Sequence, residues 1–139
     1  MALGLVWAQT REMMGSSSIT RPVELSKQPA AARRQLAQLL EDERWNGDVD
    51  GLILAVHEGM VNAQRHGGGV TGARACIDGD RVVVEIADRG RGFEIPRSAA
   101  VADVTAERGR GLFLIDHLAA EATVKRKGAE VCLTLRFER

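Results

Sequence analysis

The chain has 139 residues, which is the size of one ordinary domain, so a second full-sized domain is not expected. Its 19 basic and 19 acidic residues cancel, which argues against a general affinity for nucleic acid or anionic membranes and requires any anion site to be local. Hydrophobic residues make up 45% and charged residues 27%, which excludes a disordered chain and permits a packed core.

The N-terminal part of the chain differs from the rest. Residues 8–18 show no periodicity and end in a glycine followed by three serines, which predicts a flexible extension of residues 1–18 before a domain of residues 19–139. The apolar start lacks a basic leader, and no apolar run approaches the roughly 18 residues of a membrane span, so we expect a cytoplasmic protein. Cys76 and Cys132 lie in strand-like runs, which favours buried free thiols over a zinc site or disulfide framework.

The first half of the domain reads as a short strand at residues 19–25 followed by two helices. Pro29 suits the first turn of a helix running to residue 43, and apolar residues recur in it at helical spacing. Asp48 is a plausible N-cap for a second helix that runs to His66 and is stopped by Gly67. The buried stripe of that helix is expected to be Leu52, Val56, Met60 and Ala63.

The second half reads as strands, a loop and a third helix. Strand-like runs at residues 72–77 and 81–87 are joined by Asp78 and Gly79, which favours a tight hairpin. Residues 88–109 lack a period and predict a long loop, after which a helix is expected to follow Gly111. Residues 123–125 and 131–137 complete the sheet and turn at Gly128.

Three groups of residues could carry chemistry. In the first, Glu58, Asn62 and His66 are spaced four apart and form a polar stripe on the second helix, which by itself also fits a solvated helix face. Gly59 lies among them, and because glycine within a helix costs about 1 kcal/mol relative to alanine, it indicates close approach of another group.

The second group follows a strand and contains Asp88, Gly90 and Gly92. An aspartate at a strand end can accept a hydrogen bond from an exocyclic amine, and glycines beside it let the backbone approach a flat ring. The alternative is an ordinary turn, because aspartate and glycine are common turn residues.

The third group is expected to open a helix. Amides at a helix start form an anion cradle, and flanking arginines suit phosphates. The spacing matches neither the dinucleotide fingerprint nor the P-loop. The residues concerned are Arg108, Gly109, Arg110, Gly111 and Leu112.

In this order the three groups resemble the N box and the two glycine boxes of the GHKL, or Bergerat-fold, ATPase superfamily. Within it, the chain is most similar to the small anti-sigma-factor serine/threonine kinases of bacteria, because a glutamate precedes the asparagine by four residues and His66 and Gly67 close the N box. Sensor histidine kinases usually carry asparagine at the position of Glu58. The resemblance covers residues 19–137 and implies an α/β protein, an α+β two-layer sandwich whose mixed, mainly antiparallel sheet has helices packed on one face.

The resemblance also implies roles for individual residues. Asn62 would hold Mg²⁺ through its amide oxygen, Glu58 would be the general base, and Asp88 would accept a hydrogen bond from the adenine amino group of ATP. The remaining nucleotide contacts that it implies come from His66, Gly90, Gly92, Arg108, Gly109, Arg110, Gly111 and Leu112.

The implied function is that of an ATP- and Mg²⁺-dependent protein serine/threonine kinase that acts as an anti-sigma factor in transcription regulation. Such a kinase binds a sigma factor and phosphorylates a small antagonist protein, often as a homodimer, with no direct contact to nucleic acid or membrane. One departure is Ala129, which stands where the family often has a threonine that supports the adenine-binding aspartate. The alternatives are an ATP-binding regulatory module without kinase activity, a detached histidine-kinase catalytic domain, and an interaction domain without a nucleotide site.

Overall fold

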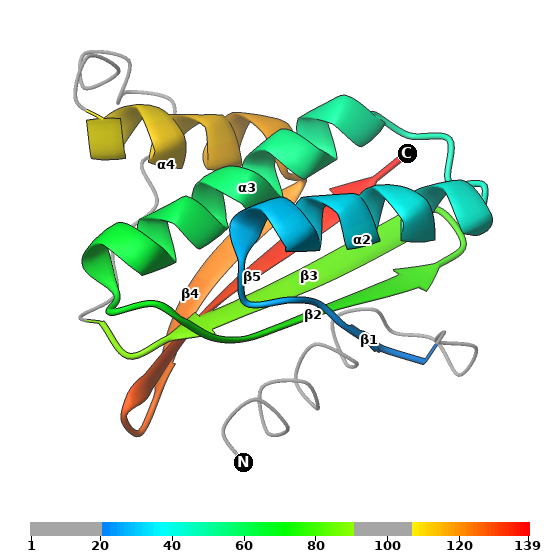
Figure 1. The fold of residues 1–139 in the computed structure, drawn as a ribbon. Coiled ribbons are helices and arrows are strands. Elements are labelled where there is room, and N and C mark those ends of the chain that lie inside the picture. Colours follow the sequence, from blue (N-terminus) through cyan, green and yellow to red (C-terminus); the bar gives the residue numbers. More distant parts are fainter. Residues whose placement is uncertain (1–20, 91–106) are drawn as a thin grey trace.

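The computed structural model describes residues 21–90 and 107–139, which form two layers (Figure 1). Three helices lie on one face of a five-stranded sheet, namely α2 (Pro29–Asp42), α3 (Val49–His66) and α4 (Glu107–Leu118). The strands are β1 (Val23–Glu24), β2 (Val70–Asp78), β3 (Arg81–Asp88), β4 (Glu121–Lys127) and β5 (Glu130–Glu138). They are ordered β1-β2-β3-β5-β4, and all four described pairings are antiparallel. The predicted α+β sandwich is confirmed.

Local sequence explains where the first two helices begin and end. Pro29 is the first residue of α2, whose buried residues are Ala32, Leu36 and Leu40. The Asp48 side chain caps α3 by accepting a hydrogen bond from the Gly51 amide at 3.0 Å, as predicted. At the other end the Gly67 amide donates to the Ala63 carbonyl at 2.9 Å, and the helix stops there.

Several element boundaries differ from the predictions, among them the extended β2 and β4 and the three that follow. The helix α4 begins at Glu107 instead of after Gly111, because burial of Leu112 and Ile115 outweighs the low helix propensity of the glycines. The hairpin loop is formed by Gly79 and Asp80, since Asp78 is already paired with Arg81. The first strand is limited to β1, and residues 19–20 lie outside the described residues.

The helices are held close to the sheet at one point of α3. A Cβ atom at Gly59 would lie 3.0 Å from both Ile86 Cδ1 on β3 and Leu133 Cδ2 on β5. The predicted reason for this glycine, close approach of another group, is therefore confirmed. At the opposite end of the helix layer, the buried Trp45 donates from Nε1 to the Asp80 carbonyl at 2.9 Å and ties the α2–α3 connection to the hairpin.

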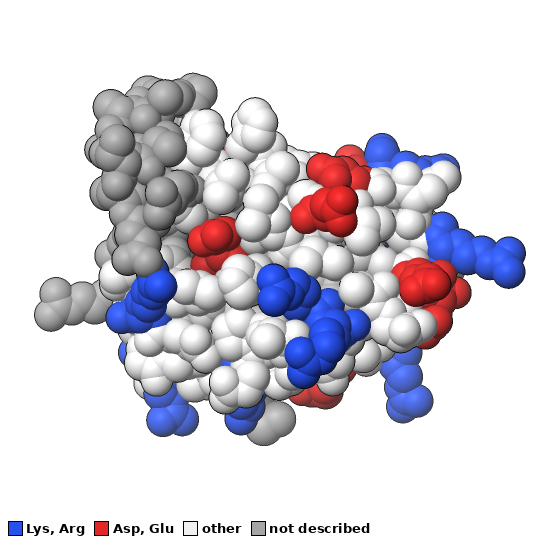
Figure 2. Space-filling model, turned by 45° about the horizontal axis from the view of Figure 1, so that its top comes forward, with Lys and Arg blue, Asp and Glu red and all other residues white. Residues whose placement is uncertain are grey.

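The surface over the helices carries both signs of charge. Figure 2 shows acidic and basic groups interspersed on this side and not gathered into one patch of a single sign. This distribution agrees with the zero net charge of the chain. None of the helices in the described part of the chain is long and apolar enough to cross a membrane.

Candidate functional site

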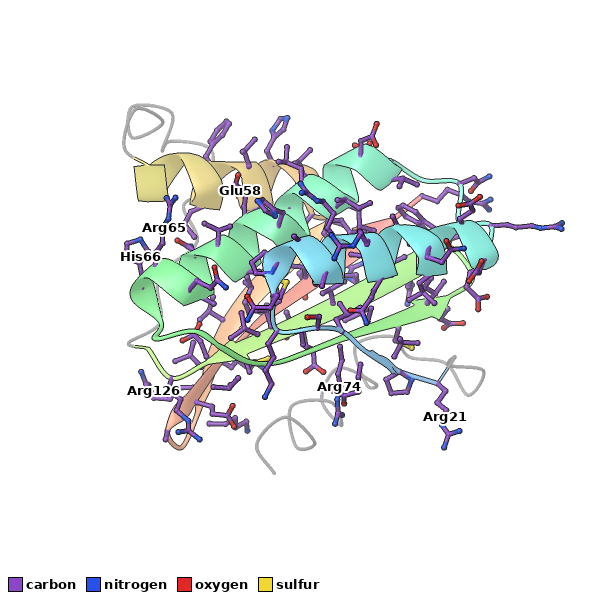
Figure 3. All side chains as sticks on the ribbon, in the orientation of Figure 1. Arg21, Glu58, Arg65, His66, Arg74 and Arg126 are labelled. Carbon is purple, nitrogen blue, oxygen red and sulfur yellow. The ribbon has the colours of Figure 1, made fainter. Side chains whose placement is uncertain are left out.

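The end of α3 and the end of β3, which carry predicted site residues, meet at one end of the sandwich. Asp88 is the last residue of β3 and pairs with Val131 of β5. Figure 3 shows Arg65 and His66 at the C-terminal end of α3, with Glu58 two turns earlier on the same helix. The fold therefore brings the first two predicted groups together from segments about 30 residues apart in sequence.

Asp88 is held by the backbone around it. Its side chain accepts a hydrogen bond from the Gly90 amide at 2.7 Å, and the Arg89 amide donates to the Gly67 carbonyl at 3.2 Å. A Cβ atom at Gly67 would overlap the Asp88 carboxyl group, and one at Gly90 would lie 2.6 Å from the Gly67 Cα atom. These two glycines are needed because the end of α3 and the end of β3 approach without room for side chains.

The environment of Asp88 changes its acidity. The residue is 7% exposed, and burial raises the pKa of its carboxyl group, against the opposing effects of the Gly90 amide and the Arg126 charge. A buried acceptor of this kind suits a hydrogen-bond donor from a bound molecule better than it suits water.

Sequence reasoning missed Arg126. From the edge strand β4 its guanidinium donates to the Gly90 carbonyl at 2.7 Å, and Figure 3 shows it beside the end of the sheet that carries the site. The only sequence signal was its place in the basic run of residues 125–127. Ala129 lies exposed in the turn between β4 and β5, and its methyl side chain has no hydroxyl to offer Asp88.

Asn62 sits one turn before the end of α3 and faces inward. It is 8% exposed, and its amide nitrogen is buried with no hydrogen-bond partner. A solvated helix face does not leave a side-chain amide in this state, because a buried polar group without a partner costs about 1 to 3 kcal/mol. The residue therefore fits a position that binds a ligand through its amide.

Magnesium would depend on few protein ligands here. In the described part of the chain, no three His, Cys, Asp or Glu side chains are grouped to hold a metal ion. Mg²⁺ commonly keeps several waters and takes further oxygens from substrate phosphates, so one amide oxygen is a sufficient protein contribution. Asn62 carries such an oxygen in Oδ1, whereas its unpartnered nitrogen is a donor and would face an acceptor of the bound molecule.

Glu58 lies against α4, the helix that carries the third group of predicted residues. Its side chain is half-buried, and a Cβ atom at Gly111 would be 2.9 Å from Glu58 Oε2. Glycine at this point of α4 lets the carboxylate lie directly against the helix. Leu112 and Ile115 are buried beneath it and fix α4 to the core.

The start of α4 corrects one part of the anion-cradle prediction. Because the helix begins at Glu107, the amides without an intrahelical partner extend through Gly109, whereas the Gly111 amide lies within the helix. Phosphate contacts by residues 108–111 stay predictions, and the side chains of Arg108 and Arg110 are outside the described set. Gly92 also lies outside the described residues, and the exposed His66 stays a predicted pocket residue.

A family comparison agrees with this arrangement. The histidine kinase-like ATPase domain family matches residues 22–137, a range that includes the three described helices and all three groups of predicted site residues. The chain belongs to this ATPase family. The resemblance to the GHKL superfamily is thereby confirmed, and with it an ATP-binding domain.

A solved structure has the same fold as this ATPase domain, and a second one resembles it less. A chain of the SiaB–SiaC complex from Pseudomonas aeruginosa superposes with a TM-score of 0.53 at 16% identity, covering 94% of this chain and 96% of that one. The histidine kinase AdeS of Acinetobacter baumannii gives a TM-score of 0.47 at 12% identity, covering 96% and 74% respectively. No curated protein matches the ATPase domain in sequence.

Proposed function

We propose that this ATPase domain is an ATP- and Mg²⁺-dependent protein serine/threonine kinase that acts as an anti-sigma factor in a partner-switching system. The observation that carries the proposal is the contact between Glu58 and the backbone of α4 at Gly111. It puts a carboxylate next to the helix whose start is expected to hold the phosphates of ATP, which is where a base for phosphoryl transfer is needed.

The nucleotide would bind with its adenine at the end of β3. Asp88 would accept a hydrogen bond from the adenine amino group, which guanine lacks at that position, and its burial makes this contact selective. Gly67 and Gly90 let the ends of α3 and β3 pack directly around this carboxyl group, and the Gly90 amide donates a hydrogen bond that holds it in place. The phosphates would then extend from Asp88 toward Asn62 and the first turn of α4.

Asn62 would bind Mg²⁺ through its amide oxygen. When bound, the ion supplies positive charge that neutralises the phosphate oxygens. The amide is already held in a buried position at the site, so little ordering of the side chain is needed on binding.

The transfer step uses a serine or threonine hydroxyl of the protein substrate. Its oxygen forms a bond to the γ-phosphorus of ATP, the bond from that phosphorus to the β,γ-bridging oxygen breaks, and ADP leaves with the electron pair. Glu58 accepts the hydroxyl proton, so the products are a phosphoprotein, ADP and a protonated carboxyl group.

Two features favour a protein partner that carries the acceptor hydroxyl. Position 58 is a glutamate, which can act as a base toward a hydroxyl, whereas an amide at that position could not. A chain of the same fold also occurs in a two-protein complex, SiaB–SiaC. A sigma factor as second partner, a homodimer and a cytoplasmic location belong to the same proposal.

The test is phosphoryl transfer from γ-labelled ATP to a candidate antagonist with Mg²⁺ present. Glu58→Gln should slow transfer by at least about 100-fold while nucleotide binding stays within a few-fold of wild type. The matched control, Glu41→Gln, changes an exposed glutamate on α2 and should leave transfer unchanged. Normal transfer by the Glu58→Gln protein, or an acid-labile phosphohistidine product, would contradict the proposal.

A second candidate is an ATP-binding regulatory module that does not transfer phosphate. It is favoured by Ala129, because Asp88 receives no side-chain hydroxyl from the turn before β5. A lost hydrogen bond of this kind costs about 0.5 to 1.5 kcal/mol, which weakens binding without abolishing it. ATP binding in calorimetry, without transfer to any protein encoded nearby, would select this candidate.

A further inference from the structure

Gly90 is hydrogen-bonded on both sides by charged side chains that come from different strands. Its amide donates to Asp88 Oδ1 at 2.7 Å, and its carbonyl accepts from the Arg126 guanidinium at 2.7 Å. The carboxylate ends β3, whereas the guanidinium belongs to the edge strand β4. A single glycine therefore links the carboxylate to which we assign adenine binding with a side chain of opposite charge.

The sheet register explains how β4 reaches this point although it does not pair with β3. Asp88 lies opposite Val131 on β5, and Val131 lies opposite Arg126. Residues aligned in this way across an antiparallel sheet share one row and one face. Figure 3 shows Arg126 at the same end of the molecule as His66, the last residue of α3. Arg126 is thus placed beside the candidate site by the order of the strands.

The charge of Arg126 acts on the charge state of Asp88. Burial raises the pKa of the Asp88 carboxyl group, whereas the hydrogen bond from the Gly90 amide and the Arg126 charge lower it. A guanidinium stays charged at any pH at which proteins are handled. Arg126 therefore favours the ionised carboxylate, and because its side chain is exposed, salt screens the effect and limits its size.

The two charge states of the carboxyl group recognise different bases. An ionised carboxylate only accepts hydrogen bonds, whereas a protonated one also donates through its O–H. Adenine presents an amino donor where guanine presents the O6 acceptor. Since Oδ1 of Asp88 is engaged by the Gly90 amide, Oδ2 is left for the base. The ionised form then matches adenine, and the protonated form matches guanine.

We propose that Arg126 determines how strongly the site prefers adenine over guanine, by fixing Gly90 against Asp88 and by placing a positive charge near that carboxylate. Arg126 is a positioning residue, because it acts through Gly90 and Asp88 and not on the base itself. The inference rests on the proposed function, in which Asp88 binds adenine. It adds to that function an exposed residue of the edge strand that controls base selectivity.

Other charged groups surround Asp88, and the test has to separate them from Arg126. The described ones are Arg65 and His66 at the end of α3, Arg89 next along the chain, Glu130 on β5, and Lys125 and Lys127 on β4, while β2 places the uncharged Val70 opposite Asp88. Histidine is the type among them that changes its charge near neutral pH. The pH dependence is therefore measured in His66→Gln as well.

The test is calorimetric titration with ADP and with GDP in the presence of Mg²⁺, which gives the ratio of the two dissociation constants. Arg126→Ala should weaken ADP by about two- to fivefold and leave GDP unchanged or bound more tightly, so the preference for ADP falls by at least about twofold. The preference should also be lost at a higher pH in Arg126→Ala than in wild type as the solution is acidified. ADP and GDP have the same phosphates, so protonation of the phosphates cancels in the ratio.

Two further variants separate charge from hydrogen bonding at position 126. Arg126→Lys keeps the charge and should keep the wild-type preference within about twofold, whereas Arg126→Gln keeps a donor without charge and should lose preference as Arg126→Ala does. The matched control Lys125→Ala removes a positive charge from the next exposed residue and should leave the preference unchanged. Urea unfolding shows that each variant is folded.

Several results would overturn the proposal. Equal weakening of ADP and GDP in Arg126→Ala would mean a structural role alone, and wild-type preference in Arg126→Gln would remove the role of charge. A pH dependence that disappears in His66→Gln would assign the titration to the histidine instead of Asp88.

The Asp88→Asn protein distinguishes failure of this inference from failure of the proposed function. If Asp88→Asn loses the preference for ADP while Arg126→Ala keeps it, the adenine contact stands and the role of Arg126 is wrong. If wild type does not distinguish ADP from GDP, or Asp88→Asn keeps the wild-type preference, the adenine contact and this inference are both wrong.

Discussion

Replacing Gly67 by alanine tests how the end of α3 holds the Asp88 carboxylate, to which we assign adenine binding. The added Cβ atom would overlap the Asp88 carboxyl group and lie 2.8 Å from the Ala63 carbonyl oxygen, which belongs to the helix backbone. The backbone cannot move easily, so the carboxyl group must shift. The backbone conformation of Gly67 itself is open to alanine, since its φ is −113°. The effect therefore arises from contact and not from dihedral strain.

The expected magnitude follows from two opposing effects. Overpacking a tight site costs about 1 to 3 kcal/mol. Replacing glycine by alanine restricts the unfolded chain and returns about 0.4 to 1 kcal/mol. We expect a net loss of about 1 to 2 kcal/mol in the free energy of unfolding. Displacing the Asp88 carboxyl group should additionally weaken ADP binding by about tenfold or more, since a hydrogen bond to a charged group contributes about 1.5 to 3 kcal/mol.

The adjacent glycine is the matched control. A Cβ atom at Gly68 would meet nothing within 4 Å, but its φ of +74° strains any other residue. Gly68→Ala should therefore cost about 1 kcal/mol of stability and leave ADP affinity unchanged. Urea unfolding and calorimetric titration with ADP measure both quantities. Wild-type ADP affinity in Gly67→Ala, or equal losses of ADP affinity in Gly67→Ala and Gly68→Ala, would refute the reasoning.

Three further predictions concern neighbouring residues. Because burial raises the pKa of Asp88, the ionised carboxylate lowers the stability of the folded protein above that pKa. Asp88→Asn should therefore be at least as stable as wild type at pH 7, with a stability that depends less on pH toward acid, and it should lose ATP affinity. Lower stability of Asp88→Asn in urea unfolding at pH 7 would contradict this. Gly59→Ala should lose up to about 2 kcal/mol in urea unfolding, because crowding against the sheet exceeds the gain in helix propensity; a gain of stability would show that α3 is not held so closely. Arg126→Ala should weaken ADP binding by about two- to fivefold in calorimetry, because it removes the exposed hydrogen bond to the Gly90 carbonyl. The control Lys125→Ala should leave ADP affinity unchanged, and equal affinities of the two variants would contradict the role of Arg126.

Short-range signals predicted the elements that depend on them. The Asp48 cap, the Gly67 stop and the apolar stripe of α3 are local patterns, and each was found at the expected residue. The start of α4 was misplaced because its two glycines have low helix propensity, and the packing of Leu112 and Ile115 that overrides them is a tertiary contact.

The candidate site was predictable where residues follow one another in motifs and not where strands meet. Glu58, Asn62 and Asp88 could be proposed from spacing and resemblance, and the fold brings the last two to the same end of the sheet. The contribution of Arg126 depends on β4 lying beside β5, which no local pattern specifies.

Titration of the protein with ATP and Mg²⁺ in a calorimeter tests the account most directly. We predict one ATP bound per chain, with GTP bound at least about tenfold more weakly, because guanine cannot donate an amino hydrogen to Asp88 at the position where adenine does. Binding that does not distinguish ATP from GTP would contradict the place given to Asp88. Failure to bind any adenine nucleotide at millimolar concentration would contradict the nucleotide site as a whole.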